Sequence, residues 1–243
     1  IDTHTYAIRL YREYESSLKF LSVRHTRETF RRVLKENRSV REFVAPKQVL
    51  VDYRLAEHYG IKGKFDEQLV AATLPANSPY GGLWTQPAIL KVTADGATTS
   101  PVKRGVWIAE RLLGNEISPP PDSIEPIVPD TRGATTLREQ LALHRNDSTC
   151  AACHKKFDPF GFALESFDVM GNFRQQYRVL DAELASAQNG AKKDKQLWKD
   201  GLPVDSTGVM PDGTPFANIH ELRNILAAQP EQLAHGVTRH LVT

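Results

Sequence analysis

The segment Cys150-Ala151-Ala152-Cys153-His154 contains both cysteines of the 243-residue chain and places a histidine directly behind the second. On one helical turn, positions i, i+3 and i+4 share a face, so both thiols and the imidazole point to the same side. The C-x-x-C-H spacing is typical of a segment that holds a covalent haem, in which the thiols form thioethers and the histidine binds the iron. We therefore expect Cys150 and Cys153 to anchor one haem c, with His154 as the proximal ligand.

Three other interpretations of this segment compete with haem. A structural zinc site needs four ligands, so it would have to recruit two further histidines. A thioredoxin-like redox pair would need a strand before the cysteines, whereas residues 136–144 have a helical pattern. A disulfide across two residues would be strained and would close only a short loop. The histidines available to a zinc site are His4, His25, His58, His144, His220, His235 and His240.

Composition excludes several other classes of protein. The chain has 31 basic and 29 acidic residues with the signs interspersed, so it lacks the charge pattern of a nucleic-acid-binding protein. No apolar run reaches the length of a membrane span. The hydrophobic share of 40 % is enough to form a core in one large or two ordinary domains.

Covalent haem also predicts where the protein works, because haem c is attached only outside the cytoplasm. The chain has no signal peptide, begins at Ile1 without a methionine and stops at Thr243 inside a helical pattern. We expect a piece of a larger exported protein, periplasmic or at the cell surface, whose targeting signal precedes Ile1.

Hydrophobic periodicity and turn residues predict a mainly α protein in two parts. Residues 1–117 are expected to form a helical domain, and residues 134–243 a c-type cytochrome-like helical haem domain. The prolines of residues 118–133 are typical of a semi-rigid connector. The expected helices are 5–37, 40–44, 47–58, 102–113, 136–144, a short one bearing the haem segment, 219–228 and 231–242, with an extended segment at 88–93 and a polar helix or excursion at 181–200.

The aromatic turn behind the haem segment supplies candidate haem contacts. The second nitrogen of a proximal histidine usually donates to a backbone carbonyl in a following proline-containing loop, and Pro159 is placed for that role. An ordinary turn proline is the alternative. Phe160 and Phe162 are expected to line the haem or the core. Arg174 is a candidate partner for a haem propionate, against the alternative of a surface ion pair.

The sixth iron ligand stays open at the level of sequence. Met210 precedes a proline at a spacing similar to that of the distal methionine in small cytochromes c, and core packing is its alternative role. Met170 falls in a helical pattern that favours core packing, and His144 is placed to fold back over the iron. With an open iron, His144 together with Arg145 or Arg138 would be the distal acid and base.

Several short motifs occur along the chain: residues 81–86 (GGLWTQ), 99–105 (TSPVKRG), 138–141 (REQL), 150–154 (CAACH), 158–168 (DPFGFALESFD) and 211–213 (PDG). Together they resemble one family, the large exported c-type cytochrome proteins of planctomycetes and related bacteria, which are built from consecutive domains of unknown function. The resemblance covers roughly Val40 to the C-terminus, and it implies a haem domain within a longer polypeptide that often has a further cytochrome c module upstream. It implies no substrate.

Three functions from different classes follow. The first, which we favour, is an electron-transfer module whose partners are other haem domains or redox proteins. The second is a haem enzyme, peroxidase-like or oxygenase-like, with an open sixth position. The third is a haem-bearing structural subunit of an extracellular assembly, in which the helices between Thr5 and His58 form the interaction surface.

Overall fold

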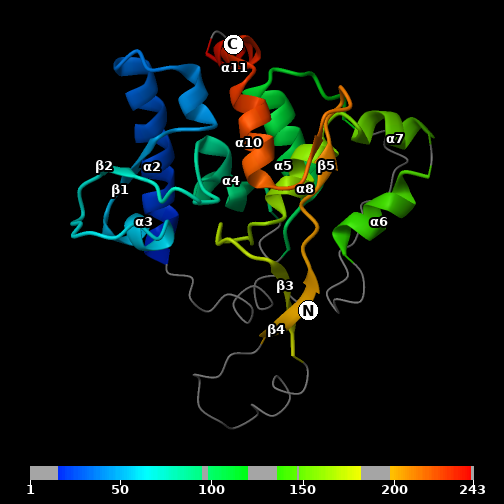
Figure 1. Cartoon of the computed structure of the whole chain (residues 1–243), viewed down its shortest axis with the longest axis horizontal. Coiled ribbons are helices and arrows are strands. Elements are labelled where there is room, and N and C mark those ends of the chain that lie inside the picture. Colours follow the sequence, from blue (N-terminus) through cyan, green and yellow to red (C-terminus); the bar gives the residue numbers. More distant parts are fainter. Residues whose placement is uncertain (1–15, 95–97, 120–135, 147, 182–197, 242–243) are drawn as a thin grey trace.

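The computed structural model describes residues 16–94, 98–119, 136–146, 148–181 and 198–241. Helices gather around a shared core, and the hairpin of β3 and β4 extends away from them (Figure 1). None of the helices in these ranges is long and apolar enough to cross a membrane.

The first part of the chain combines helices with a small sheet. A long helix packs on β1 and is followed by short elements. The elements are α2 (Ser16–Lys35), η1 (Val40–Phe43), β1 (Gln48–Val51), α3 (Tyr53–His58) and β2 (Val70–Thr73), with β1 and β2 antiparallel.

The helix that we expected over 47–58 is wrong in its first half. Residues 48–51 form β1, whose Gln-Val-Leu-Val sequence suits a strand with buried Val49 and Val51. Asp52 then caps the shorter helix α3, because its Oδ1 accepts a hydrogen bond from the Leu55 amide at 2.9 Å. The apolar residues before Asp52 thus belong to a strand, although their spacing also fits a helix.

The middle of the chain is helical, and a second expectation about it is wrong. Residues 88–93, expected to be extended, belong to the helix α4, which has Pro87 in its first turn. The helix expected over 102–113 is present, with a π-helical second half that ends before Gly114 at φ +70°. The elements are η2 (Leu83–Thr85), α4 (Pro87–Val92), α5 (Pro101–Trp107) and η3 (Ile108–Leu112).

The last part of the chain carries short helices and two hairpins. The predicted capping box is confirmed, with Thr136 and Glu139 bonding each other's backbone amides at the start of α6. Its elements are α6 (Leu137–His144), α7 (Ser148–His154), α8 (Asp158–Leu164), β3 (Gln176–Leu180), β4 (Trp198–Pro203), β5 (Gly208–Val209), β6 (Pro215–Phe216), α10 (Ile219–Ala227) and α11 (Pro230–Arg239). Most of the expected 181–200 segment lies outside the described residues.

The expectation of a mainly α protein is wrong. The structure has 46 % helix and 15 % strand, and the residues that it describes form three small antiparallel sheets, β1-β2, β3-β4 and β5-β6. The sequence pattern did not predict these strands, because each is short and its hydrogen-bond partner lies in another segment of the chain. Both expected helical domains contain such a sheet.

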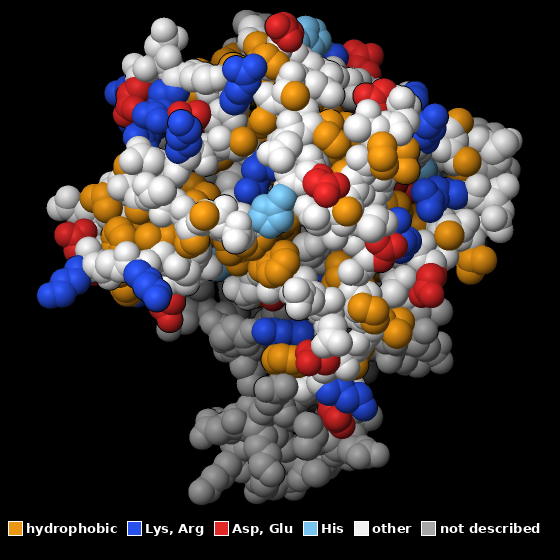
Figure 2. Space-filling view, viewed as in Figure 1, with side chains coloured by type: hydrophobic (Ala, Val, Ile, Leu, Met, Phe, Trp, Pro, Cys, Tyr) orange, Lys and Arg blue, Asp and Glu red, His pale blue; other side chains and the backbone are white. Residues whose placement is uncertain are grey.

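One core cluster contains residues from both expected domains, from Val33 to Val237. Its tightest junction joins α5 and α8: a Cβ on Gly161 would lie 1.8 Å from the Pro101 carbonyl oxygen, so only glycine permits this approach. The predicted two-domain division stays a prediction, and all of the connector except residues 118 and 119 lies outside the described residues. On the face shown in Figure 2, basic and acidic side chains are interspersed, as expected for a net charge of +2.

Candidate functional site

The segment Cys150–His154 lies in the helix α7, as expected. Cys150, Cys153 and His154 lie on this one helix at positions i, i+3 and i+4, and no disulfide joins the two thiols. Cys153 packs partly against the main core. The side chain of His154 is only 13 % exposed. The segment is therefore anchored to the folded body.

His154 is held by a carboxylate from the next helix. Its Nδ1 lies 3.0 Å from Oδ1 of Asp158, the first residue of α8, and this carboxylate is fully buried. A tight turn makes the contact possible, because the Phe157 amide bonds the His154 carbonyl at 3.2 Å and turns the chain back toward α7. Packing by Phe157, whose ring centroid lies 4.9 Å from that of His154, further restricts the imidazole. An imidazole that uses Nδ1 for a carboxylate binds a metal through Nε2.

The second oxygen of Asp158 faces a cation from α6. Nη1 of Arg145 lies 3.5 Å from Asp158 Oδ2, and the Arg145 side chain is 30 % exposed. Buried carboxylates require such pairing, because an isolated charge inside a protein is costly. His154, Asp158 and Arg145 thus form one connected polar group.

A cleft of about 860 Å³ borders this group, within the size range of small-molecule and cofactor sites. Its lining includes Arg138, whose guanidinium carbon lies 3.9 Å from the centroid of the Phe162 ring. Arg138 also donates to the carbonyls of Asp205 and Thr207, and its burial lowers the pKa of this guanidinium. The cleft is lined from α6 by Arg138, Ala142 and Arg145, from α7 and the turn by Ala151 and Lys155, from α8 by Pro159 and Phe162, and elsewhere by Thr207, Gly208, Val209, Pro215, Phe216, Ala217 and Glu221.

This donor set is chemically suited to haem c. Two thiols one helical turn apart and an imidazole whose Nδ1 is held by a buried carboxylate are the donors that covalent attachment and proximal ligation need. The cleft lies beside this donor set: it is lined from α7 by Ala151, and not by Cys150, Cys153 or His154. Haem binding itself stays a prediction. Among the described residues, no group of three or more histidine, cysteine, aspartate or glutamate side chains is placed to hold a metal ion.

The other predicted haem contacts occupy three different environments. Pro159 is buried at the second position of α8 and lines the cleft, while the observed partner of His154 Nδ1 is the neighbouring Asp158 carboxylate rather than a backbone carbonyl. Phe160 is 1 % exposed and belongs to the main core. The guanidinium of Arg174 binds the carbonyl and carboxylate of Glu165. Its predicted contact with a propionate stays a prediction.

The candidates for the sixth iron ligand also lie in different parts of the structure. Met210 is 4 % exposed in the main core, and its backbone forms the turn between β5 and β6, next to the cleft residue Val209. Met170 packs with Val169 in a small second cluster and lies in a turn, not in the helix that its spacing predicted. His144 ends α6, and its side chain lies outside the described residues.

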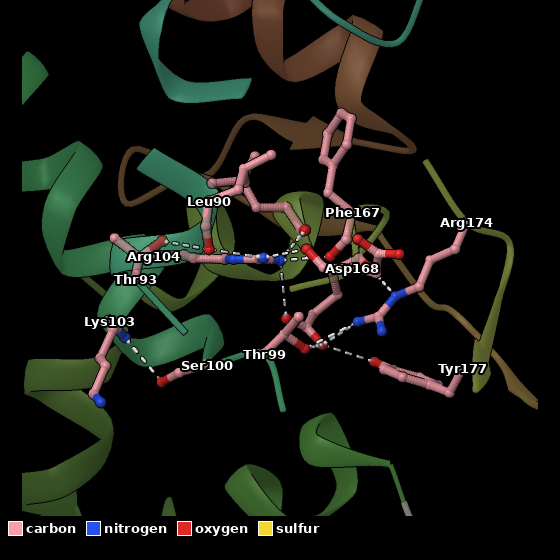
Figure 3. Close-up of polar contacts among 12 residues, drawn as sticks. Leu90, Thr93, Thr99, Ser100, Lys103, Arg104, Phe167, Asp168, Arg174 and Tyr177 are labelled. Atoms are coloured by element: carbon pink, nitrogen blue, oxygen red, sulfur yellow. Dashed lines mark hydrogen bonds and ion pairs between the residues drawn. The ribbon is translucent and has the colours of Figure 1, made fainter. Parts of the chain in front are cut away.

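A buried polar network holds the far end of α8 (Figure 3). Arg104 of α5 is fully buried and donates to the carbonyls of Leu164, Phe167, Asp168 and Leu90. A cation at the end of a helix satisfies its last carbonyls and complements the helix dipole.

Glu165 links Arg104 to the rest of the network. Its carboxylate lies 3.7 Å from Arg104 Nη1 and 3.3 Å from Arg174 Nη2, and it accepts hydrogen bonds from Thr99 at 2.7 Å and Tyr177 at 3.2 Å. Burial and the charge of Glu165 raise the pKa of Tyr177 well above its usual range, so this phenol stays a donor. The network therefore fixes α8, and with it Asp158, against α5.

Sequence reasoning missed Asp158, Arg104 and Glu165. The spacing of four between His154 and Asp158 was a usable signal, because residues four apart meet on helical turns. Arg104 and Glu165 lie within two of the motifs that carry the family resemblance, 99–105 and 158–168, but nothing in the sequence indicated that these two distant residues meet.

Two consecutive stretches of the chain match families of unknown function, which is consistent with a protein built from several such domains. Residues 80–177, which include Cys150–His154 and Asp158, match PSCyt3, a protein family of unknown function (DUF1588). Residues 1–61 match PSD4, a second family of unknown function (DUF1592). The name PSCyt3 suggests a cytochrome-like domain. Neither the curated proteins nor the solved structures contain a match to this chain.

Proposed function

We propose that this chain is a mono-haem c-type cytochrome module of a larger exported protein, and that it transfers electrons to other haem domains or redox proteins. The observation that carries the proposal is the placement of Cys150, Cys153 and His154 on one turn of α7 with His154 held by Asp158. The cytochrome-like name of the matched family agrees with it. A bound haem supplies reversible one-electron chemistry.

Each residue of the segment has a separate role in this proposal. The thiols of Cys150 and Cys153 anchor the haem covalently, so the module keeps it outside the cell. His154 provides the proximal nitrogen, and Asp158 fixes the tautomer and orientation of its ring. Phe162 and Pro159 give the neighbouring cleft apolar surface that excludes water.

A haem enzyme with an accessible iron is the second candidate. The observation that favours it is the cleft itself, which is lined by Arg138 and Arg145, and Arg145 also pairs with the Asp158 carboxylate that contacts His154. In this reading, the arginines bind or polarise a small anionic substrate.

The first experiment tests covalent haem. The chain is expressed with an export signal in a host that attaches haem c, and haem is detected on a denaturing gel and by its absorption spectrum. We expect haem to stay with the wild-type chain and with the control His235→Gln, which alters an exposed histidine of α11. The double variant C150A/C153A should retain none covalently. A wild-type chain without haem would refute the proposal.

Carbon monoxide then separates the two candidate functions. A reduced spectrum that carbon monoxide does not change indicates protein ligands on both sides of the iron and supports electron transfer. A shifted spectrum indicates an accessible iron and favours the haem enzyme.

A further inference from the structure

The carboxyl group that contacts His154 is buried, and only one of its two oxygens has a hydrogen-bond partner among the described residues. Asp158 Oδ1 lies 3.0 Å from His154 Nδ1, and the carboxylate is fully buried. Within the described part of the chain, its Oδ2 has no hydrogen-bond donor and meets only the longer 3.5 Å ion pair with Arg145. Much of the negative charge is therefore directed at the imidazole.

A carboxylate acts on an imidazole more strongly than a carbonyl does. A charge-assisted hydrogen bond is roughly twice as strong as a neutral one, and the low local dielectric of a buried site strengthens it further. A carboxylate that accepts the Nδ1 proton makes the ring a more basic ligand. A more basic ligand stabilises Fe(III) relative to Fe(II).

We infer that Asp158 is a positioning residue that lowers the reduction potential of the haem by increasing the donor strength of His154. This inference rests on the proposed function, and it goes beyond it by assigning the direction in which the module is tuned. The module favours the ferric state and acts as a relatively strong electron donor when reduced.

Arg145 opposes this effect. Its guanidinium attracts the same carboxylate through Oδ2 and reduces the charge available to His154. Removal of Arg145 should therefore shift the potential in the opposite direction to removal of the Asp158 charge. Two variants that are expected to shift the reduction potential in opposite directions therefore test the same contact between Asp158 and His154.

The structure offers a matched control for each variant. Asp205 is a carboxylate paired with Arg138 at 3.2 Å, and Arg138 stacks on Phe162 as Arg145 does, at 3.9 Å against 5.5 Å. Asp205 and Arg138 form no described hydrogen bond or ion pair with His154 or Asp158, although the charge of Asp158 acts on Arg138 at longer range. Asp205→Asn and Arg138→Gln therefore measure the effect of removing a charge beside the cleft without breaking a direct contact of Asp158.

The experiment is a potentiometric titration of the haem-loaded protein, followed by absorption. Asp158→Asn should shift the oxidation equilibrium toward Fe(II) by about tenfold or more, which is about 59 mV for one electron. Arg145→Gln should shift it toward Fe(III), by more than Arg138→Gln does. Asp205→Asn should shift it less than threefold.

The outcomes separate the inference from the proposed function. Haem in the wild type with an Asp158→Asn shift no larger than that of Asp205→Asn overturns the inference alone. If Asp158→Asn does not mature, an Arg145→Gln potential equal to or above that of Arg138→Gln overturns it. A wild-type chain without covalent haem overturns both.

Discussion

Arg104 shows how one side chain links distant parts of the chain. It is fully buried, and it reaches carbonyls on both sides of the core, at Leu90 and at Leu164. A buried charge of this kind stabilises the fold only while all of its partners are present, since each would otherwise be left unpaired.

Arg104→Met should lower the free energy of unfolding by about 3–5 kcal/mol, because it leaves Glu165 and several carbonyls buried with fewer partners. Urea unfolding measures the loss. The control is Lys103→Met, an exposed neighbour on the same helix, which should change stability by less than about 0.5 kcal/mol. Equal effects of the two substitutions would contradict the role of Arg104.

Two histidines are buried without hydrogen bonds to some of their nitrogens. Both nitrogens of His25 and Nε2 of His58 are buried without partners in the described residues. Burial lowers the pKa of His25 to about 3, with a further contribution from His58. Burial also lowers the pKa of His58 to about 4, partly offset by Asp168 and Asn172. Both rings therefore stay neutral in the folded protein.

These pKa values predict acid sensitivity. Below about pH 6.5 the unfolded histidines take up protons that the folded ones do not, so stability is full above this pH and falls as the pH decreases toward 4. Each histidine contributes at most about 1.4 kcal/mol per pH unit. Urea unfolding at pH 7.5 and 5 should show a smaller loss for His25→Phe than for the wild type. The control His235→Gln, at an exposed position, should lose as much stability between pH 7.5 and pH 5 as the wild type does.

At the scale of elements, the crossing of α5 and α8 decides where the site lies. Two glycines face backbone across this junction: a Cβ on Gly105 would lie 2.2 Å from the Phe157 carbonyl oxygen, and one on Gly161 would lie 1.8 Å from that of Pro101. Backbone cannot move aside as a side chain can, so the helices approach this closely only with glycine. The start of α8, with Asp158, is thereby placed beside α7.

Gly161→Ala should destabilise the protein by about 1–3 kcal/mol, since the methyl group forces the two helices apart. Gly201→Ala is the control, because its Cβ would meet the Val179 side chain at 2.8 Å and no backbone atom closer than the Tyr177 carbonyl oxygen at 3.2 Å, compared with 1.8 Å at Gly161. Thermal or urea unfolding of both variants checks the prediction. A Gly161→Ala protein as stable as the Gly201→Ala protein would show that the crossing is looser than described.

At the scale of the whole molecule, the core joins residues from the start to the end of the described chain. Val33, Phe43 and Leu55 belong to the same cluster as Leu164 and Leu233. Helix α11 contacts both η1 and η3, so the last helix rests on early elements. A continuous core predicts cooperative unfolding.

We expect one unfolding transition, in which the tryptophan fluorescence of a Trp198→Phe variant coincides with far-ultraviolet circular dichroism. The remaining tryptophans, Trp84 and Trp107, report on the first half of the chain, whereas circular dichroism reports on all helices. Two separated transitions would instead support the boundary at residues 118–133 that the sequence predicted.

The sequence alone determined the local features of this protein. The capping box of Thr136 and Glu139, the helix end at Gly114 and the short helix at Cys150–His154 follow from contacts between residues a few positions apart. The tertiary structure decided the rest. Whether residues 48–51 form a helix or a strand depends on pairing with Val70–Thr73, and the burial of Arg104 depends on carbonyls about 60 residues away. Such choices depend on the free energy of long-range contacts, which no local pattern encodes.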